Sequence, residues 1–267
     1  MSIYGTMSLL AEVNVLEEIV SKKWTIHVGT YEIPFTNHML MITVASLVLM
    51  VAFPLAMRQP GLVRRGFGNM IEAVCVILRE DMARPFLKDQ TDRYIGILWT
   101  LFFFILTMNI LGMMPIAQAV FAFTGYKHIG GAPTANVWVT GALAVFSFVL
   151  FHAAGIKQKG IWHYIKTFCP KVPIAMLPFM FVLEVVSSFV RMFTLAIRLF
   201  ANILAGHILL GVVLSFIVIY KTYMVATASI LGTLMFSLLE VFVAFLQAYI
   251  FVFLTTIFIG FAISDEH

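Results

Sequence analysis

Charged residues are scarce in this sequence, and their scarcity excludes several classes of protein. Asp, Glu, Lys and Arg make up 11% of the 267 residues, whereas a soluble globular domain carries about 25%. So few charges cannot cover a water-facing surface. The composition therefore excludes a soluble cytosolic enzyme, a nucleic-acid-binding protein and a disordered chain, and we expect no nucleic acid among the partners.

Cysteine is almost absent as well. The two cysteines, Cys75 and Cys169, lie far apart and have neither the spacing of metal ligands nor that of a redox motif. The cysteines therefore carry no information on function. We expect neither a metal ion nor a cofactor.

Apolar residues, in contrast, are in excess. They form 61% of the chain, and the mean hydropathy is +1.00, so the surrounding solvent must be a lipid bilayer. A bilayer core about 30 Å thick is crossed by roughly 20 apolar residues in a helix. Three segments meet this requirement, namely 39–57, 95–114 and 135–154.

Two further apolar segments, 172–220 and 223–263, are too long for a single perpendicular crossing. Between Phe179 and Ala205 no Gly or Pro offers a turn. We therefore expect two long, steeply tilted helices that form a hairpin with its break near Tyr220. The predicted fold is all-α: a polytopic membrane protein with about five transmembrane crossings, a membrane domain over 38–263 and a C-terminal tail over 264–267.

The distribution of Lys and Arg predicts the orientation. Segments 58–93 and 155–174 together hold eleven of them, while 115–134 holds only Lys127. Because cytoplasmic loops of membrane proteins are enriched in Lys and Arg, we expect 58–93 and 155–174 to be cytoplasmic loops. The N-terminus then lies outside and the C-terminus lies in the cytoplasm.

Two amphipathic segments lie outside these spans. Within the N-terminal segment 1–37, expected on the outer face, a helix over 9–20 would place four apolar residues on one stripe: Leu9, Val13, Leu16 and Val20. In the first cytoplasmic loop, Asn69 is expected to cap a helix whose apolar stripe is Ile71, Val74, Leu78 and Met82. Both helices fit either the membrane interface or docking on a partner subunit.

Two arginines, Arg191 and Arg198, lie inside an apolar helix. An Arg at the bilayer centre costs about 2.5–3.5 kcal/mol on insertion scales, so it needs a partner or a water-filled cavity. Arg191 either snorkels to the interface or lies on the face of Arg198. At about 100° per residue, that face also holds small or polar residues: Thr194, Ala201, Asn202 and Ala205. The pattern predicts a close contact that presents to a partner a positive charge unable to carry protons.

Ionisable and amide side chains form a second pattern. His207 lies on the opposite face of the helix from Arg198, and the last helix carries a stripe of Ser237, Glu240, Ala244 and Gln247. We expect His207 and Glu240 to pass protons between them and Gln247 to hydrogen-bond Arg198. Glu184 would lie on a second aqueous path, and Asn109 is a further polar candidate.

Each of these residues also has a purely structural interpretation. His207 would be a packing histidine, Glu240 the ion-pair partner of an Arg, and Glu184 a residue in headgroup water. Gln247 and Asn109 would be ordinary interhelical hydrogen bonders. The combination of two polar stripes on neighbouring helices favours the functional interpretation.

The run from Arg198 to His207, Arg-Leu-Phe-Ala-Asn-Ile-Leu-Ala-Gly-His, resembles the signature of subunit a of the F-type ATP synthase. Leu-Gln-Ala-Tyr-Ile-Phe at 246–251 resembles the last helix of that family. Met108-Asn109 before Pro115, and Pro-Thr-Ala-Asn at 133–136, are similar to its second span and to the start of its third.

The resemblance implies a stator subunit, not catalytic by itself, that flanks a rotating ring of c subunits and provides two offset aqueous half-channels. Arg198 matches the arginine that faces the ring carboxylates, with Asn202 and Gln247 as supporting polar residues. His207 and Glu240 match two positions of the outer half-channel. Bacterial members carry Glu at the first position and His at the second, whereas this chain has the two exchanged, as mitochondrial members do. Glu184 matches an inner half-channel carboxylate.

Two positions receive no role from the resemblance. Arg191 matches no position with a known function, and Gly112 stands where some relatives have Asp. The implied partners are the c-subunit ring, the b-subunit stalk, other ATP synthase subunits and the lipid bilayer. The implied location is a bacterial plasma membrane, or alternatively the mitochondrial inner membrane.

Two other functions remain open at this point. A sodium-translocating version of the same subunit differs in the ring carboxylate site, which is not in this chain. A self-contained transporter or channel would conduct ions alone, and many such folds have internal repeats, which this sequence lacks.

Overall fold

The computed structural model describes residues 23–28, 31–57, 66–114, 132–162, 164 and 176–264. The helix predicted over 9–20 lies outside these residues. The first described elements are the strands β1 (Lys23–Val28) and β2 (Tyr31–Thr36), which pair antiparallel with Lys23 opposite Thr36. This short hairpin was not predicted from the sequence.

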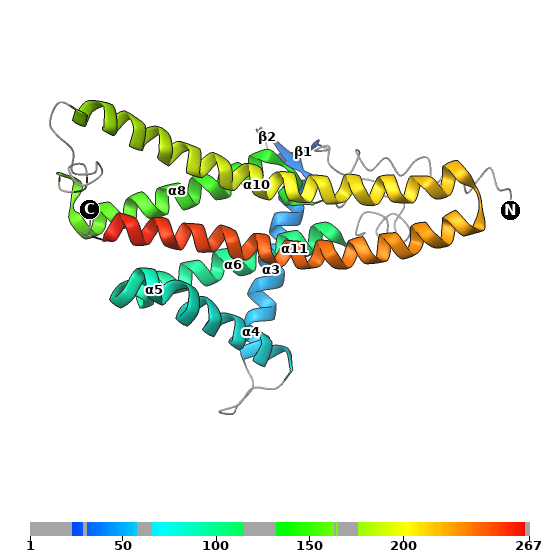
Figure 1. Ribbon diagram of the computed structural model, residues 1–267, viewed down its shortest axis with the longest axis horizontal. Coiled ribbons are helices and arrows are strands. Elements are labelled where there is room, and N and C mark those ends of the chain that lie inside the picture. Colours follow the sequence, from blue (N-terminus) through cyan, green and yellow to red (C-terminus); the bar gives the residue numbers. More distant parts are fainter. Residues whose placement is uncertain are drawn as a thin grey trace. The chain divides into compact units, whose positions relative to one another are not determined.

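Helices form nearly all of the remaining described structure (Figure 1). The longer ones are α3 (Asn37–Met57), α4 (Phe67–Val76), α6 (Thr91–Met113), α8 (Val137–Lys159), α10 (Leu177–Tyr220) and α11 (Tyr223–Ile263). A π-helical segment, Ile77–Ala83, connects α4 to the single turn α5 (Arg84–Leu87), and short 3₁₀ turns precede α6 and α8 at Lys88–Gln90 and Pro133–Ala135.

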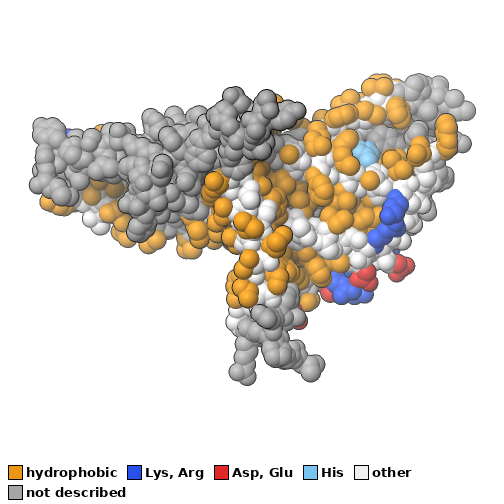
Figure 2. Space-filling view, turned by 180° about the vertical axis from the view of Figure 1, so that it is seen from behind, with side chains coloured by type: hydrophobic (Ala, Val, Ile, Leu, Met, Phe, Trp, Pro, Cys, Tyr) orange, Lys and Arg blue, Asp and Glu red, His pale blue; other side chains and the backbone are white. Residues whose placement is uncertain are grey.

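Five helical stretches of the described chain are long and apolar enough to cross a membrane, which confirms the predicted all-helical membrane fold. They are Asn37–Ala56, Phe67–Met113, Val137–Lys159, Phe179–Ile217 and Tyr223–Ile263. Figure 2 agrees with this composition, because hydrophobic side chains cover much of the described face while charged ones gather in a small area.

Side-chain caps explain where two of these helices begin. The Thr36 hydroxyl oxygen accepts a hydrogen bond from the Met39 backbone N–H at 3.3 Å, at the start of α3. The Asn136 amide oxygen accepts one from the Trp138 N–H at 2.9 Å, at the start of α8. Both polar caps satisfy backbone donors that the first helical turn leaves unpaired.

The last two helices form the predicted hairpin. They contain 44 and 41 residues, or about 66 and 62 Å at 1.5 Å per residue, roughly twice the thickness of a bilayer core. The turn between them starts at Lys221, whose φ of 48° is left-handed, as is common just after a helix C-terminus. Helices of this length fit a membrane only when strongly tilted.

The chain forms two compact units. Unit 1 takes its residues from Met1–Leu47, Leu106–Val139 and Leu199–Gln247, and unit 2 takes the rest. In unit 1 the second half of α10 and the first half of α11 run antiparallel (Figure 1). Ile203 of α10 packs against Ala132 and Ala135, and all three side chains are buried.

The core of unit 2 joins α8 to the last turns of α11. The Ser147 and Thr255 hydroxyls, both fully buried, are 2.6 Å apart. Further along the same two helices the rings of Phe151 and Phe258 lie 5.7 Å apart, and the Lys159 ammonium donates to the Ser264 carbonyl. From the first contact to the last, the residue numbers rise along both segments, so α8 and this part of α11 run in the same direction.

The expectation that Asn69 caps a helix was wrong. Helix α4 begins at Phe67, after Gly66, whose φ of 66° favours glycine. Of the predicted stripe, Ile71, Leu78 and Met82 are buried, but Cys75 takes the buried place expected for Val74. Val74 and Cys75 lie three and four residues after Ile71 within α4, and both positions share its face in an α-helix. Packing therefore decides which of the two is buried.

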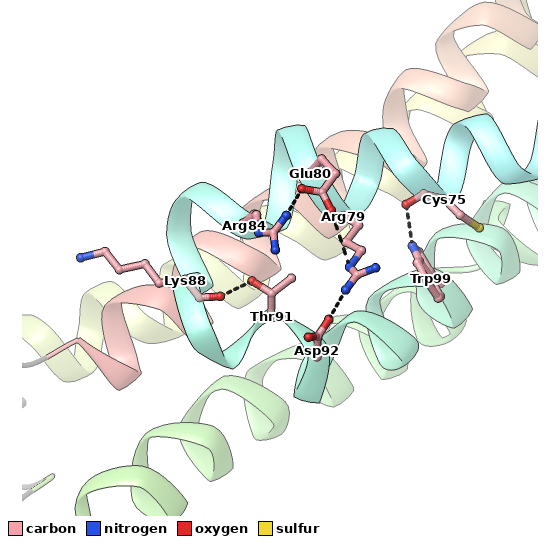
Figure 3. A network of polar contacts seen from close by, with 8 residues as sticks. All are labelled: Cys75, Arg79, Glu80, Arg84, Lys88, Thr91, Asp92 and Trp99. Carbon is pink, nitrogen blue, oxygen red and sulfur yellow. Dashed lines mark hydrogen bonds and ion pairs between the residues drawn. The ribbon is translucent and has the colours of Figure 1, made fainter.

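The buried stripe of α4 packs on the chain itself, which neither interpretation of this helix foresaw. Ile71 and Cys75 cluster with Ala56, against the partly buried Phe53, Trp99 and Phe103 of α3 and α6. The Trp99 indole donates a hydrogen bond to the Cys75 carbonyl at 3.1 Å, and Arg79 pairs with Asp92 at 2.6 Å (Figure 3). Polar contacts thus connect the start of α6 to the helices that precede it.

Replacing Gly112 by Ala should destabilise the protein, because a Cβ atom there would lie 2.7 Å from the Ala132 Cβ. We expect Gly112→Ala to lower the free energy of unfolding by about 1–3 kcal/mol, as overpacking does. The measurement is thermal unfolding of the detergent-solubilised protein.

Gly141→Ala is the matched control, since nothing lies within 4 Å of a Cβ at this position of α8. It should leave stability unchanged or raise it by up to about 1 kcal/mol, because Ala favours helix more than Gly does. Equal stabilities of the two variants would contradict the close contact at Gly112.

Candidate ion-translocation site

Arg198 lies on an exposed face of α10. Its side chain is exposed, as are those of its neighbours on this face, Thr194, Ala201 and Ala205. Asn202, one turn further along, is half-buried. A permanently charged group thus stands among small side chains, which would let a partner helix approach closely. This is the arrangement that the helical spacing predicted.

Gln247 is buried on α11, where it is 5% exposed. It shares a face with the buried Glu240 and Ala244 and the half-buried Ser237, so the predicted polar stripe faces the interior. Arg198 belongs to unit 2 and Gln247 to unit 1. The hydrogen bond expected between them stays a prediction.

In unit 1 the carboxyl group of Glu240 lies directly against Gly206. A Cβ atom at Gly206 would collide with the Glu240 Oε1 and would lie 2.8 Å from its Cδ. Glycine therefore makes room on α10 for a carboxyl group supplied by α11. His207 follows Gly206 in the chain and is half-buried, which places the two predicted proton-path residues at the same level of the helix pair.

Asn109, on α6, is fully buried in the same unit. Its side-chain N–H donates a hydrogen bond to the Ala244 carbonyl of α11 at 3.3 Å. Ala244 lies one helical turn after Glu240 along α11. The amide of Asn109 is therefore fixed near the level of the carboxyl group.

Several buried polar atoms of unit 1 have no hydrogen-bond partner among the described residues. Two are His207 Nε2 and Glu240 Oε1, so these two atoms do not bond each other. Three more are Asn109 Oδ1 on α6, Thr134 Oγ1 on the 3₁₀ turn Pro133–Ala135, and Thr233 Oγ1 on α11. Buried polar atoms in proteins are normally satisfied by protein or ordered water, so these groups are suited to line a hydrated path.

Unit 2 holds the other predicted carboxylate, and here it is paired. Glu184 accepts a hydrogen bond from the Arg191 guanidinium at 3.2 Å, and both side chains are about one-third exposed. The guanidinium also lies 5.4 Å from the centre of the Phe258 ring on α11, within the range of a cation–π contact. Arg191 is thus neither a lone snorkelling residue nor the partner of Glu240.

Unit 2 also contains a second polar group, which was not predicted from the sequence. On α8 the His152 Nδ1 lies 2.8 Å from the Tyr164 hydroxyl, and its Nε2 lies 3.0 Å from the Ser188 hydroxyl of α10. Burial, followed by the nearby Glu184 carboxylate, raises the pKa of Tyr164 to about 12, so its hydroxyl keeps its proton. The sequence contains one indication of this group, because Ser188 lies one helical turn after Glu184 on the same face of the helix.

The sequence profile described as ATP synthase A chain matches residues 39–260. Among curated relatives, the ATP synthase subunit a of Chloroherpeton thalassium is 33% identical over 250 residues, which are 90% of this chain and 70% of the relative. That of Myxococcus xanthus is 37% identical over 243 residues, covering 90% of this chain and 76% of the relative.

The ATP synthase subunit a of an Anaeromyxobacter species is 34% identical over 248 residues, 90% of this chain but 58% of the relative. The chain thus spans between 58% and 76% of the length of these three proteins. The matched region contains the exposed Arg198 face, the Gly206–Glu240 contact and the Glu184–Arg191 pair. This chain belongs to the ATP synthase A chain family.

Proposed function

We propose that this chain is the stator subunit of a proton-translocating ATP synthase, in which it conducts protons to and from a rotating ring of c subunits. It makes and breaks no bond of ATP itself. The observation that carries the proposal is Arg198, a fixed charge exposed among small residues on a long, largely apolar helix. A purely structural membrane scaffold has no use for a charge in that position.

In this mechanism a proton reaches the ring from the outer side of the membrane. It passes the polar groups of unit 1, among which His207 and Glu240 can each hold and release a proton. Their unpartnered buried atoms support a water-linked transfer, since a direct bond between these atoms is not formed. The proton then neutralises a carboxylate of the ring, which can enter the lipid without its charge.

Arg198 acts where the carboxylate comes back from the lipid. A guanidinium favours the ionised form of a nearby carboxyl group and, with a pKa above about 12, does not itself pass the proton on. The released proton leaves on the inner side, near Glu184. One elementary charge crossing the membrane yields about 2.3 kcal/mol per 100 mV, and a leak past Arg198 would dissipate this work without rotation.

The charge distribution and the bacterial relatives support a proposed orientation and location in the membrane. The excess of Lys and Arg in 58–93 and 155–174 supports a cytoplasmic C-terminus and an N-terminus outside. Relatives from bacteria support the bacterial plasma membrane. The proposed partners are the c-subunit ring, the b-subunit stalk and the remaining subunits of the synthase.

Arg198→Ala should abolish ATP synthesis driven by a proton gradient, because nothing then holds the ring carboxylate ionised between the two half-channels. The measurement is ATP synthesis in inverted membrane vesicles that contain the assembled complex. Arg93→Ala is the control, since it removes one exposed arginine at the start of α6. Wild-type synthesis in the Arg198 variant would refute the proposed role.

Gly206→Ala should slow ATP synthesis by about tenfold or more, because the new methyl group takes the space of the Glu240 carboxyl group. No ionisable group is removed, so the effect reports the position of the carboxyl. At Gly232 a Cβ would make only an ordinary contact, 3.7 Å from Val213, and Gly232→Ala should retain most activity. Equal rates in the two variants would argue against a role for the Gly206–Glu240 contact.

The choice between protons and sodium is tested by the ion dependence of ATP hydrolysis in membranes. We expect hydrolysis to acidify inverted vesicles in sodium-free buffer and added sodium to leave its rate unchanged. Stimulation by sodium, with acidification only as a secondary response, would assign the sodium-translocating function instead.

A further inference from the structure

His152 connects two other side chains of unit 2 through both of its ring nitrogens. Its Nδ1 lies 2.8 Å from the Tyr164 hydroxyl, and its Nε2 lies 3.0 Å from the Ser188 hydroxyl. In a neutral imidazole one nitrogen donates and the other accepts. Such a ring can take up a proton at one side and release another at the opposite side, which makes it suited to relay protons.

The packing around His152 holds this geometry in place. The imidazole lies 4.4 Å, centre to centre, from the rings of both Phe148 and Phe151, and Ser188 is 3% exposed. The Tyr164 ring lies over Gly155, where any Cβ atom would collide with it and would approach the Ala262 Cβ to 3.1 Å. A glycine at 155 therefore allows the tyrosine to reach the histidine.

The charged groups near Tyr164, His152 and Ser188 come from α10. Ser188 lies one turn after Glu184 and one turn before Arg191, and these two form the ion pair described above. Tyr164 is close enough to both that each affects the pKa of its hydroxyl. From α11, Phe258 faces Arg191, and the residues of that helix from 248 to 263 include no Asp, Glu, His, Lys or Arg.

We propose that His152 is a proton-relay residue of the inner half-channel, acting in series with Glu184 through Ser188 and Tyr164. This inference rests on the proposed function and deepens it. No assigned role of Glu184 or Arg198 requires a histidine on α8, whereas the two hydrogen bonds of its ring give protons a route from Ser188 of α10 to Tyr164, beyond the end of α8.

The transfer balances with one proton entering and one leaving. A proton from the Glu184 side reaches the Ser188 oxygen while the Ser188 hydroxyl proton moves to His152 Nε2. The proton on Nδ1 then passes to the Tyr164 oxygen, and the proton of Tyr164 leaves to water on the inner side. All groups end neutral, and rotation of the hydroxyls with a change of imidazole tautomer restores the starting state.

The test compares His152→Ala with the wild type in the assembled synthase, as ATP synthesis in membrane vesicles. We expect at least a tenfold loss, restored in large part by added imidazole and not by pyrazole, a ring of the same size that does not protonate near neutral pH. Equal rescue by both compounds would indicate that the ring only fills space, and it would overturn the relay. A wild-type rate without any additive would overturn it as well.

Tyr164→Phe provides a second test that preserves packing, because it removes only the hydroxyl and leaves the ring over Gly155. We expect a loss of several-fold and a pH dependence of the rate on the inner side that differs from the wild type. An unchanged rate and pH profile would exclude the route through Tyr164, whether or not His152→Ala assembles.

Arg198→Ala measured in parallel separates the two proposals. Loss of synthesis in Arg198→Ala, with wild-type behaviour of the His152 and Tyr164 variants, would overturn the relay alone. Retained synthesis in Arg198→Ala would overturn the proposed function itself.

Discussion

The free energy of placing a charge or an unpaired polar group among apolar helices governs the functional part of this protein. Each such group must be paired, hydrated or turned toward a partner that compensates it. The two arginines of α10 illustrate two of these solutions. Arg191 is held by a carboxylate and an aromatic ring of its own unit. Arg198 is exposed among small side chains, and the proposed function gives it a ring carboxylate as its compensating group.

The polar groups of the two units are satisfied in different ways. In unit 1 the buried atoms of His207, Glu240 and Asn109 include several without a partner among the described residues, which favours water between them. In unit 2 the side chains bond one another directly, as in the Glu184–Arg191 pair and the Tyr164–His152–Ser188 chain. The proposed outer route is therefore water-linked, and the proposed inner route runs through side chains.

Glycines set the position of the groups that carry the proposed chemistry. Gly206 leaves the space that the Glu240 carboxyl group occupies, and Gly155 leaves the space of the Tyr164 ring. Gly112 lies against Ala132, so this position has no room for a larger side chain. Close backbone approach, which only a missing Cβ permits, is thus a requirement of the site as well as of the helix packing.

The amino-acid sequence by itself determined the membrane fold, the three shorter spans, the two long helices with their break near Tyr220, and the exposed face of Arg198. These follow from hydropathy, helix periodicity and the cost of a buried charge, all of which act along one segment at a time. Tertiary structure alone decided that Cys75 replaces Val74 in the core, because both positions share the face of Ile71 and packing selects between them. It also decided that Gly206 receives Glu240 and that His152 joins Tyr164 to Ser188, because these contacts between segments distant in the chain depend on helix packing that no local pattern encodes. The Glu184–Arg191 pair lies within α10, seven residues apart, and was not predicted either.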